Sequence, residues 1–221
     1  MLSNPSVIKQ AQEELDRVVG PDRTPNFKDE ANLPYIRGMI KETLRLRPIN
    51  KFGNNHYNVE DDWYNGFFIP KNSIIMANWW FIHFDPKHYP EPDKFLPERW
   101  VDYPYSAAKA AVLPDGTRRG HLSYGGGRRI CAGLHVAEKN LFINFARLLW
   151  GFDVMHTLDD CGNAIPVDYG TTGLQPGSSS VAKPFQCQIK ARSKAHARQF
   201  RKEWELAEAE GIDFSQIKWT I

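Results

Sequence analysis

One stretch of eleven residues, Ser123 to Gly133, concentrates the residue types that favour chemistry at a bound group. It reads Ser-Tyr-Gly-Gly-Gly-Arg-Arg-Ile-Cys-Ala-Gly and holds four glycines, two arginines and one cysteine. Glycine lets the backbone approach a ligand closely and adopt positive φ angles, so a cysteine among glycines is presented at a flat face. The chemistry that this pattern favours is a thiolate directed at a metal. We therefore interpret the stretch as a site and not as part of a core.

The segment after the cysteine predicts the element that positions it. Apolar residues recur there at the three-to-four spacing of a buried helix face. These residues are Leu134, Ala137, Leu141, Phe145 and Leu148, within a helix expected over 134–150. Cys131 would then lie just before a helix N-terminus, where the dipole and the free N–H groups favour an anion. The neighbouring cations Arg128 and Arg129 favour the thiolate in the same way.

The sequence from Tyr124 to Gly133 resembles the haem-binding loop of the cytochrome P-450 family, usually Phe-Gly-x-Gly-x-Arg-x-Cys-x-Gly. The resemblance implies that Cys131 is the axial thiolate ligand of a haem b iron, and that Arg129 contacts a haem propionate. It assigns further cofactor contacts to Tyr124, Gly125, Gly127 and Gly133. Tyr124 departs from the family's usual Phe, but an aromatic ring still shields the sulfur. A thiolate ligand donates electron density to iron and favours O–O cleavage.

Two other kinds of site use residues of the types found in this loop. Gly-Gly-Gly-Arg-Arg would suit a phosphate cradle, but no Lys-Ser/Thr follows and no strand-loop-helix fingerprint surrounds it. His121, Cys131 and His135 would suit zinc, but a structural zinc site needs a fourth ligand and the chain has no Cys-x-x-Cys pair. The haem loop accounts for more of the residues than either alternative.

A second motif lies on a helix expected over 35–46, where Glu42 and Arg45 share one face and are able to pair. Alone, Glu-x-x-Arg is common on surface helices. The cytochrome P-450 family has this motif before its cysteine loop, closed by an arginine from a Pro-Glu-Arg-Phe-like segment. Here that segment is Phe95-Leu-Pro-Glu-Arg-Trp100. The resemblance implies one buried ion cluster of Glu42, Arg45 and Arg99, with a structural role behind the haem.

Between these motifs the sequence predicts short strands at 63–70 and 73–78, and it favours a core position for Trp79, Trp80 and Phe81. A lone histidine is usually an ordinary surface or core residue. His56 nevertheless matches a family position that donates to a haem propionate. By the same resemblance, residues 49–55 would line a substrate pocket, and the tip of a C-terminal hairpin near 171–173 would touch substrate.

The first helix is expected after Asn4-Pro5, with Ile8, Ala11, Leu15 and Val18 buried and with Glu13, Glu14, Asp16 and Arg17 on a solvated face. After Ser193 the chain becomes charged. A helix over 196–210 would present a narrow apolar stripe of Phe200, Trp204 and Ala207. The expected division is a partial family domain at 1–192 and a charged C-terminal extension at 193–221.

Composition limits the function classes. The 221 residues carry 28 basic and 26 acidic side chains, so the net charge of +2 gives no electrostatic case for nucleic-acid binding. Three cysteines form no disulfide framework. No window approaches the roughly 18 apolar residues that a membrane span needs, although eukaryotic members of the family are usually anchored in the endoplasmic reticulum membrane.

The expected fold is mainly α with small β-sheets, corresponding to the C-terminal half of the cytochrome P-450 fold, without its distal helix and N-terminal half. The expected function is a haem-thiolate monooxygenase, here a truncated chain. Such an enzyme inserts one atom of O₂ into a small organic substrate with electrons from an NADPH-dependent reductase. A non-catalytic haem-binding remnant, and an isomerase or dehydratase on the same fold, remain as alternatives. The paired tryptophans and the His83-x-Asp-Pro segment are similar to those of fungal members.

Overall fold

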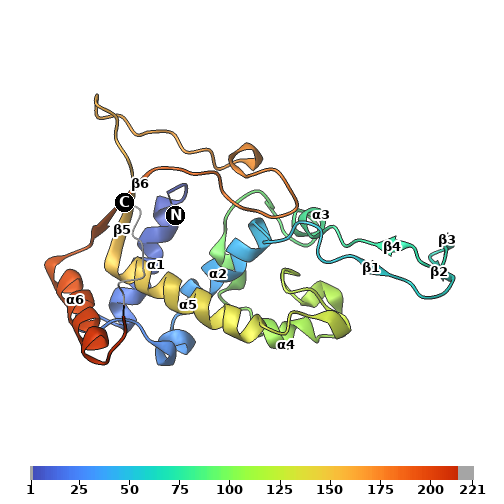
Figure 1. The fold of residues 1–221 in the computed structure, drawn as a ribbon, viewed down its shortest axis with the longest axis horizontal. Coiled ribbons are helices and arrows are strands. Elements are labelled where there is room, and N and C mark those ends of the chain that lie inside the picture. Colours follow the sequence, from blue (N-terminus) through green and yellow to red (C-terminus); the bar gives the residue numbers. More distant parts are fainter. Residues whose placement is uncertain (1, 214–221) are drawn as a thin grey trace. The chain divides into compact units, whose positions relative to one another are not determined.

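The computed structural model describes residues 2–213 (Figure 1). These residues divide into two compact units. The first unit comprises residues 2–36, 140–166 and 186–213, and the second comprises 37–139 and 167–185. The cysteine loop and the Glu-x-x-Arg motif at Glu42 and Arg45 both fall within the second unit. The candidate site is therefore built by one unit.

The described residues are mainly helical, as expected. The α-helices are α1 (Pro5–Val18), α2 (Pro34–Leu46), α3 (Trp79–His83), α4 (Ala107–Ala111), α5 (Leu134–Gly151) and α6 (Lys194–Ala209). Short 3-10 turns are η1 (Phe27–Asn32), η2 (Pro97–Trp100), η3 (Gly116–Arg118), η4 (Gly127–Arg129) and η5 (Thr171–Gly173). The strands are β1 (His56–Tyr57), β2 (Asp62–Tyr64), β3 (Phe67–Ile69), β4 (Ile74–Ile75), β5 (Phe152–His156) and β6 (Cys187–Ala191). They pair as three two-stranded antiparallel sheets, β1 with β4, β2 with β3, and β5 with β6.

Helix α1 forms where the sequence predicts it, but one acidic residue lies on the wrong side of the expected pattern. Ala11 and Leu15 are fully buried, as expected, whereas the carboxylate of Glu14 is also buried and not solvated. It accepts the backbone N–H groups of Tyr35 at 3.0 Å and Ile36 at 3.1 Å. The first N–H groups of a helix have no partner within that helix. Glu14 is buried because it satisfies two of them at the start of α2.

Helix α5 has the expected bounds but a different buried face. The side chains most buried in its second half are those of Phe142, Ala146, Leu149 and Trp150. The first three each lie one residue after the expected Leu141, Phe145 and Leu148. The expected residues are only partly buried. The α-helix period of 3.6 is not an integer, so a stripe drawn at fixed three-to-four steps can shift by one position along 18 residues.

The segments predicted as strands at 63–70 and 73–78 lie in a narrow ribbon that extends from α3 within the second unit (Figure 1). The prediction of one strand at 63–70 is wrong, because the chain turns back within this segment. Strands β2 and β3 are joined at Asn65-Gly66, both with positive φ, and Trp63 contacts Phe68 across the hairpin with ring centroids 5.1 Å apart. The core position expected for Phe81 is wrong, because this side chain is 72% exposed on the short helix α3. Trp79 and Trp80 are partly buried.

The charged C-terminal segment forms α6 and packs within the first unit. His196 lies edge-on to Trp150 with centroids 4.4 Å apart, and Phe200 contacts both Trp150 and Phe152. Glu203 accepts a hydrogen bond from Thr24. The packing expected for Phe200 is therefore confirmed. His196 also packs on Trp150, which the sequence pattern did not predict. The domain boundary at residue 192 stays a prediction.

Candidate functional site

The cysteine loop has a closed backbone geometry. The N–H of Cys131 donates to the carbonyl oxygen of Tyr124 at 2.9 Å, and the carbonyl oxygen of Cys131 accepts from Leu134 at 3.3 Å. Gly125 and Gly127 have φ angles of 74° and 66°, a region that other residues rarely adopt. The loop therefore turns back on itself and delivers the cysteine directly before α5.

The thiol of Cys131 is exposed, and the glycines beside it leave open space. A Cβ atom added at Gly127 would meet nothing within 4 Å, and one added at Gly133 would meet only the Cys131 sulfur, at 3.9 Å. At Gly125 the nearest atom would be the Arg129 carbonyl oxygen, at 3.9 Å. This open surface beside a thiol is suited to a flat ligand.

The two expected propionate donors are exposed. Arg129 ends η4, and His56 lies on β1 opposite Ile75. Within residues 2–213, neither side chain forms a hydrogen bond or an ion pair. The structure thus leaves both side chains accessible and does not join them to each other.

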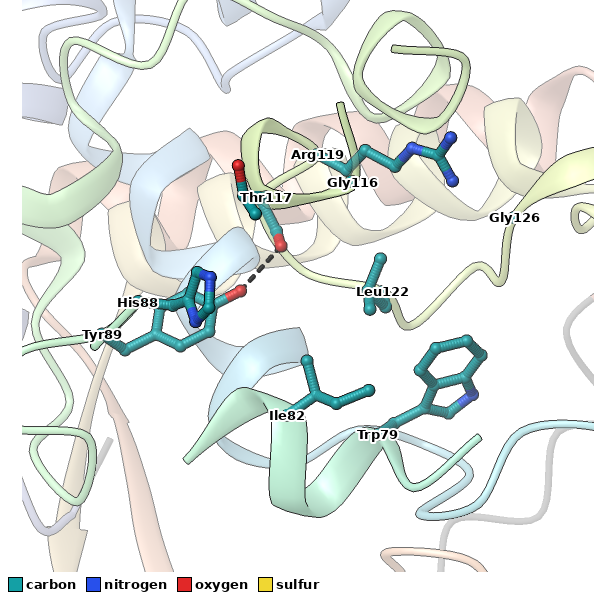
Figure 2. A pocket seen from close by; sticks show the side chains of 10 residues that line it. Trp79, Ile82, His88, Tyr89, Gly116, Thr117, Arg119, Leu122 and Gly126 are labelled. Atoms are coloured by element: carbon teal, nitrogen blue, oxygen red, sulfur yellow. Dashed lines mark hydrogen bonds between the residues drawn. The ribbon is translucent and has the colours of Figure 1, made fainter. Parts of the chain in front are cut away.

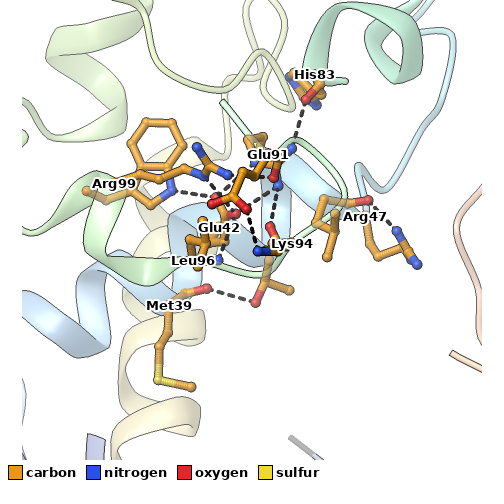
Figure 3. Close-up of polar contacts among 12 residues, drawn as sticks. Met39, Glu42, Arg47, His83, Glu91, Lys94, Leu96 and Arg99 are labelled. Carbon is orange, nitrogen blue, oxygen red and sulfur yellow. Dashed lines mark hydrogen bonds and ion pairs between the residues drawn. The ribbon is translucent and has the colours of Figure 1, made fainter. Parts of the chain in front are cut away.

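The structure brings Glu42, Arg45 and Arg99 together (Figure 3). Glu42 and Arg45 are fully buried, and Arg45 donates to both carboxylate oxygens, with Nε–Oε2 and Nη2–Oε1 distances of 2.9 and 2.8 Å. Arg99 Nε lies 3.3 Å from Glu42 Oε1. Two planar groups paired in this way hold their relative orientation as well as their charge.

The cluster contains further partners that the sequence motifs did not indicate. Trp100 Nε1 donates to Glu42 Oε2 at 2.8 Å, and the N–H of Leu96 donates to Oε1 at 3.1 Å. Arg45 also donates to the carbonyl oxygens of His83 at 2.8 Å and Lys94 at 3.1 Å. The buried charges therefore have several hydrogen-bond partners, which a buried ion pair requires. The position of Trp100 beside Arg99 was the one available sequence signal.

Two buried histidines lie between this cluster and the cysteine loop. His83 is fully buried, and burial lowers its pKa to about 4. The pKa of His121 is lowered well below its usual value, mainly by burial and further by the nearby Lys41 and His83. The ring of His121 lies 5.5 Å from that of Tyr124, whose own pKa burial raises. Both histidines are therefore neutral at pH 7.

A cavity of about 380 Å³ borders the loop on the side of residues 119–122 (Figure 2). Trp79, Ile82 and Leu122 provide apolar walls. Tyr89 lines another side, where its hydroxyl donates to the carbonyl oxygen of Gly120 at 2.7 Å. The cavity thus lies against the segment that leads into the cysteine loop.

The start of one segment expected to contact substrate, residues 49–51, is joined to residues 178–180, which follow the other expected segment at 171–173. Asn50 pairs with Ser179 in an antiparallel bridge, and Lys51 N–H donates to the carbonyl oxygen of Ser178 at 2.8 Å. The N–H of Ser180 donates to the carbonyl oxygen of Ile49 at 3.0 Å. Residues 49–51 and 178–180 therefore form one surface of the second unit.

The zinc alternative receives no support. In the part of the chain that the structure describes, no group of three His, Cys, Asp or Glu side chains is arranged to hold a metal ion. His121 is buried, whereas Cys131 and His135 are exposed. The cysteines at 131, 161 and 187 are free thiols.

No helix within residues 2–213 is both long and apolar enough to cross a bilayer.

Comparison with known proteins identifies the class. The family model described as Cytochrome P-450 matches residues 1–166, so this chain belongs to the cytochrome P-450 family. Several of its curated relatives are fungal cytochrome P-450 monooxygenases. They include the monooxygenases verL of Clonostachys rogersoniana, 44% identical over 209 residues, and virE of Hypocrea virens, 42% identical over 206 residues. The alignments cover 95% and 93% of this chain.

The solved structures agree. A zebra fish cytochrome P-450 structure with abiraterone matches with a TM-score of 0.70 and 26% identity, covering 86% of this chain. In each comparison the chain spans about two fifths of the other protein, 38% of verL, 37% of virE and 41% of the zebra fish chain. The chain thus matches part of the cytochrome P-450 fold, as the sequence predicts.

Proposed function

We propose that this chain is the haem-binding part of a haem-thiolate monooxygenase, with Cys131 as the axial ligand of a haem iron. The observation that carries the proposal is the cysteine loop itself. It presents an exposed thiol directly before the N-terminus of α5, on a backbone closed by the Cys131–Tyr124 hydrogen bond. A helix N-terminus favours the thiolate form that ligates a metal.

The residues present fit a haem. The Cβ positions at Gly125, Gly127 and Gly133 are open, so a planar macrocycle has room against the loop. Arg129 and His56 are exposed donors suited to carboxylate propionates. A thiolate sulfur is a known ligand of haem iron. The donor set and the open surface both support the assignment.

When bound, a thiolate-ligated haem supplies the redox chemistry by which such an enzyme inserts one oxygen atom from O₂ into an organic substrate. The chain's own residues would hold and orient that cofactor. Cys131 would provide the thiolate, and the N–H groups at the start of α5 would stabilise its charge. The joined segments 49–51 and 178–180 would form one wall of a substrate pocket. An NADPH-dependent reductase would supply the electrons.

The test is haem reconstitution of the purified chain followed by the reduced carbon-monoxide difference spectrum. We expect a thiolate-type band from the parent chain and its loss in Cys131→Ala, because alanine removes the ligand. Cys161→Ala and Cys187→Ala serve as matched controls, since both are free cysteines outside the loop, and each should keep the band.

Loss of the band in either control with retention in Cys131→Ala would overturn the ligand assignment. Haem binding without reductase-dependent turnover of any substrate would instead favour the non-catalytic alternative. Turnover that proceeds without external electrons would favour an isomerase or dehydratase.

A further inference from the structure

Three side-chain hydrogen bonds hold the segment that leads into the cysteine loop. Tyr89 Oη donates to the Gly120 carbonyl oxygen at 2.7 Å, and Ser123 Oγ donates to the Leu44 carbonyl oxygen at 2.7 Å. Between them, the N–H of Leu122 donates to Nε2 of His83 at 2.8 Å. These contacts join residues between 31 and 79 positions apart in the sequence. The base of the loop is therefore fixed by tertiary contacts.

Among the three anchors, His83 is hydrogen-bonded to the ion cluster, whereas Tyr89 contacts the cluster through its ring, whose centroid lies 5.3 Å from the Arg45 guanidinium carbon. The carbonyl oxygen of His83 accepts from Arg45 Nη1 at 2.8 Å, while its ring accepts from Leu122 (Figure 3 shows the contact with Arg45). Arg45 in turn is held by both oxygens of Glu42. A continuous chain of hydrogen bonds thus runs from Glu42 through Arg45 and His83 to the residue before Ser123.

The ring of His83 is held in one protonation state by this arrangement. A neutral imidazole has one accepting and one donating nitrogen, so acceptance at Nε2 places the proton on Nδ1. The residue is fully buried, and its ring lies edge-on to Tyr89 with centroids 6.3 Å apart. A protonated ring would have no acceptor for Leu122. The contact therefore depends on the neutral ring.

We propose that His83 is a positioning residue that couples the buried ion cluster to the cysteine loop, through the Leu122 N–H bond to its Nε2 atom. The consequence of this coupling for cofactor binding rests on the proposed haem-thiolate function. The coupling between the ion cluster and the loop does not depend on that function. His83 would set the position from which the loop turns toward Cys131, so the thiol would meet the metal at a fixed place. It does not touch the reacting atoms.

A neighbouring histidine provides the contrast. His121 is also buried and lies closer in sequence to the loop, and its ring packs near Trp100 and Tyr124. Within residues 2–213 it forms no hydrogen bond to the loop backbone. If general packing by a buried histidine were sufficient, His121 and His83 would be equivalent. The coupling proposed here is specific to His83.

The experiment is amide hydrogen exchange, read by mass spectrometry, on the full chain without haem. The variants are His83→Leu, which removes the acceptor, His83→Gln, which keeps an acceptor near the Nε2 position, and His121→Phe as the matched control. We expect His83→Leu to raise exchange at Leu122 and through residues 122–131 about tenfold, the effect of losing roughly 1.4 kcal/mol of local hydrogen-bond stability. His83→Gln and His121→Phe should stay within about twofold of the parent.

A second readout uses the reconstituted chain. His83→Leu should lower the fraction of bound haem that shows the thiolate-type carbon-monoxide band, and His83→Gln should restore it. If the parent chain binds no haem, the proposed function fails while the exchange result still decides the coupling. Positioning and cofactor binding are thereby tested separately.

Three outcomes would overturn the coupling. The first is equal exchange in His83→Leu and the parent. The second is an increase spread evenly over the second unit, which indicates a merely structural role. The third is an equal effect of His121→Phe. If His83→Leu does not fold, His83→Asn replaces it, because its shorter side chain does not reach the Leu122 N–H; identical exchange in the Asn and Gln variants would then refute the proposal.

Discussion

At the scale of single residues, the molecule places several ionisable groups in a buried environment and compensates them unequally. Glu42 is compensated by two arginines, an indole and a backbone N–H. His83 and His121 have few polar partners, and each remains neutral because burial penalises the charged form. Opposite charge and hydrogen bonds thus compensate the buried carboxylate of Glu42.

The ion cluster predicts a large cost for removing its central charge. Glu42→Gln leaves Arg45 buried without a counter-charge, and we expect a loss of about 3–5 kcal/mol in the free energy of unfolding, measured by urea denaturation. Arg99→Ala should reduce soluble protein more than it alters the haem spectrum of what survives, because Arg99 supports the cluster from its edge. The control is Glu91→Gln, since Glu91 pairs with Lys94 at an exposed site and its replacement should have little effect on stability. Equal effects of Glu42→Gln and Glu91→Gln would contradict a stabilising cluster.

The lowered pKa of His83 predicts an acid-sensitive window. The unfolded chain binds a proton at this residue below its ordinary pKa of 6.5, whereas the folded chain does so only near pH 4. Between these values acid favours unfolding, so stability should fall as the pH drops from about 6.5 to 4 and change little above that range.

His83 contributes at most about 1.4 kcal/mol per pH unit to this loss. The measurement is the free energy of unfolding against pH for the parent chain and His83→Gln. The variant should show a shallower slope in this window, and identical slopes would refute the assignment of that proton to His83. His121 is present in both proteins, and the variant loses only the part that His83 plays in lowering the pKa of His121.

At the scale of elements, α2 connects distant parts of the sequence. Its spacing puts Glu42 and Arg45 on one face, and the carbonyl oxygen of Leu44 accepts from Ser123 of the cysteine loop. The carboxylate of Glu14 in α1 accepts hydrogen bonds from two backbone N–H groups in the first turn of α2. One helix thus receives a cap at its start and anchors the site near its end.

The cap predicts an effect of removing Glu14. Glu14→Ala leaves the N–H groups of Tyr35 and Ile36 without this acceptor, and we expect a loss of about 1–2 kcal/mol, the usual cost of deleting a helix cap. Glu13→Ala is the control, because Glu13 is exposed and pairs only with Lys9 at 3.9 Å. Thermal or urea unfolding of both variants provides the comparison, and a Glu14→Ala cost no larger than that of the control would rule out the capping role.

At the scale of the whole molecule, the described surface carries unusually exposed aromatic side chains on the ribbon of β1 to β4. Trp63, Tyr64 and Phe67 are 68%, 69% and 75% exposed. Exposed apolar patches of this kind promote association. The short strands also have unpaired edges, which invite further strand pairing. Both features belong to one part of the second unit.

This surface predicts self-association that a single substitution reduces. Phe67→Thr keeps a residue suited to a strand while removing an exposed ring, so the monomer fraction in light scattering coupled to gel filtration should rise. Stability should change by less than about 0.5 kcal/mol, as for other exposed positions. Val136→Thr is the control, because Val136 is 66% exposed on α5, away from the ribbon. An equal gain in both variants would show that the ribbon is not the site of association.

The sequence by itself determined the local chemistry. The glycines, arginines and cysteine of residues 123–133, the spacing of Glu42 and Arg45, and the bounds of α2 and α5 all follow from short-range patterns. Only the tertiary structure decided which buried groups satisfy one another. Glu14 was assigned to a solvated face, and His83 and Trp100 were not recognised, because their partners lie 21, 39 and 58 residues away. Hydrogen bonds over such separations form when packing brings the chain together, and no local periodicity records them.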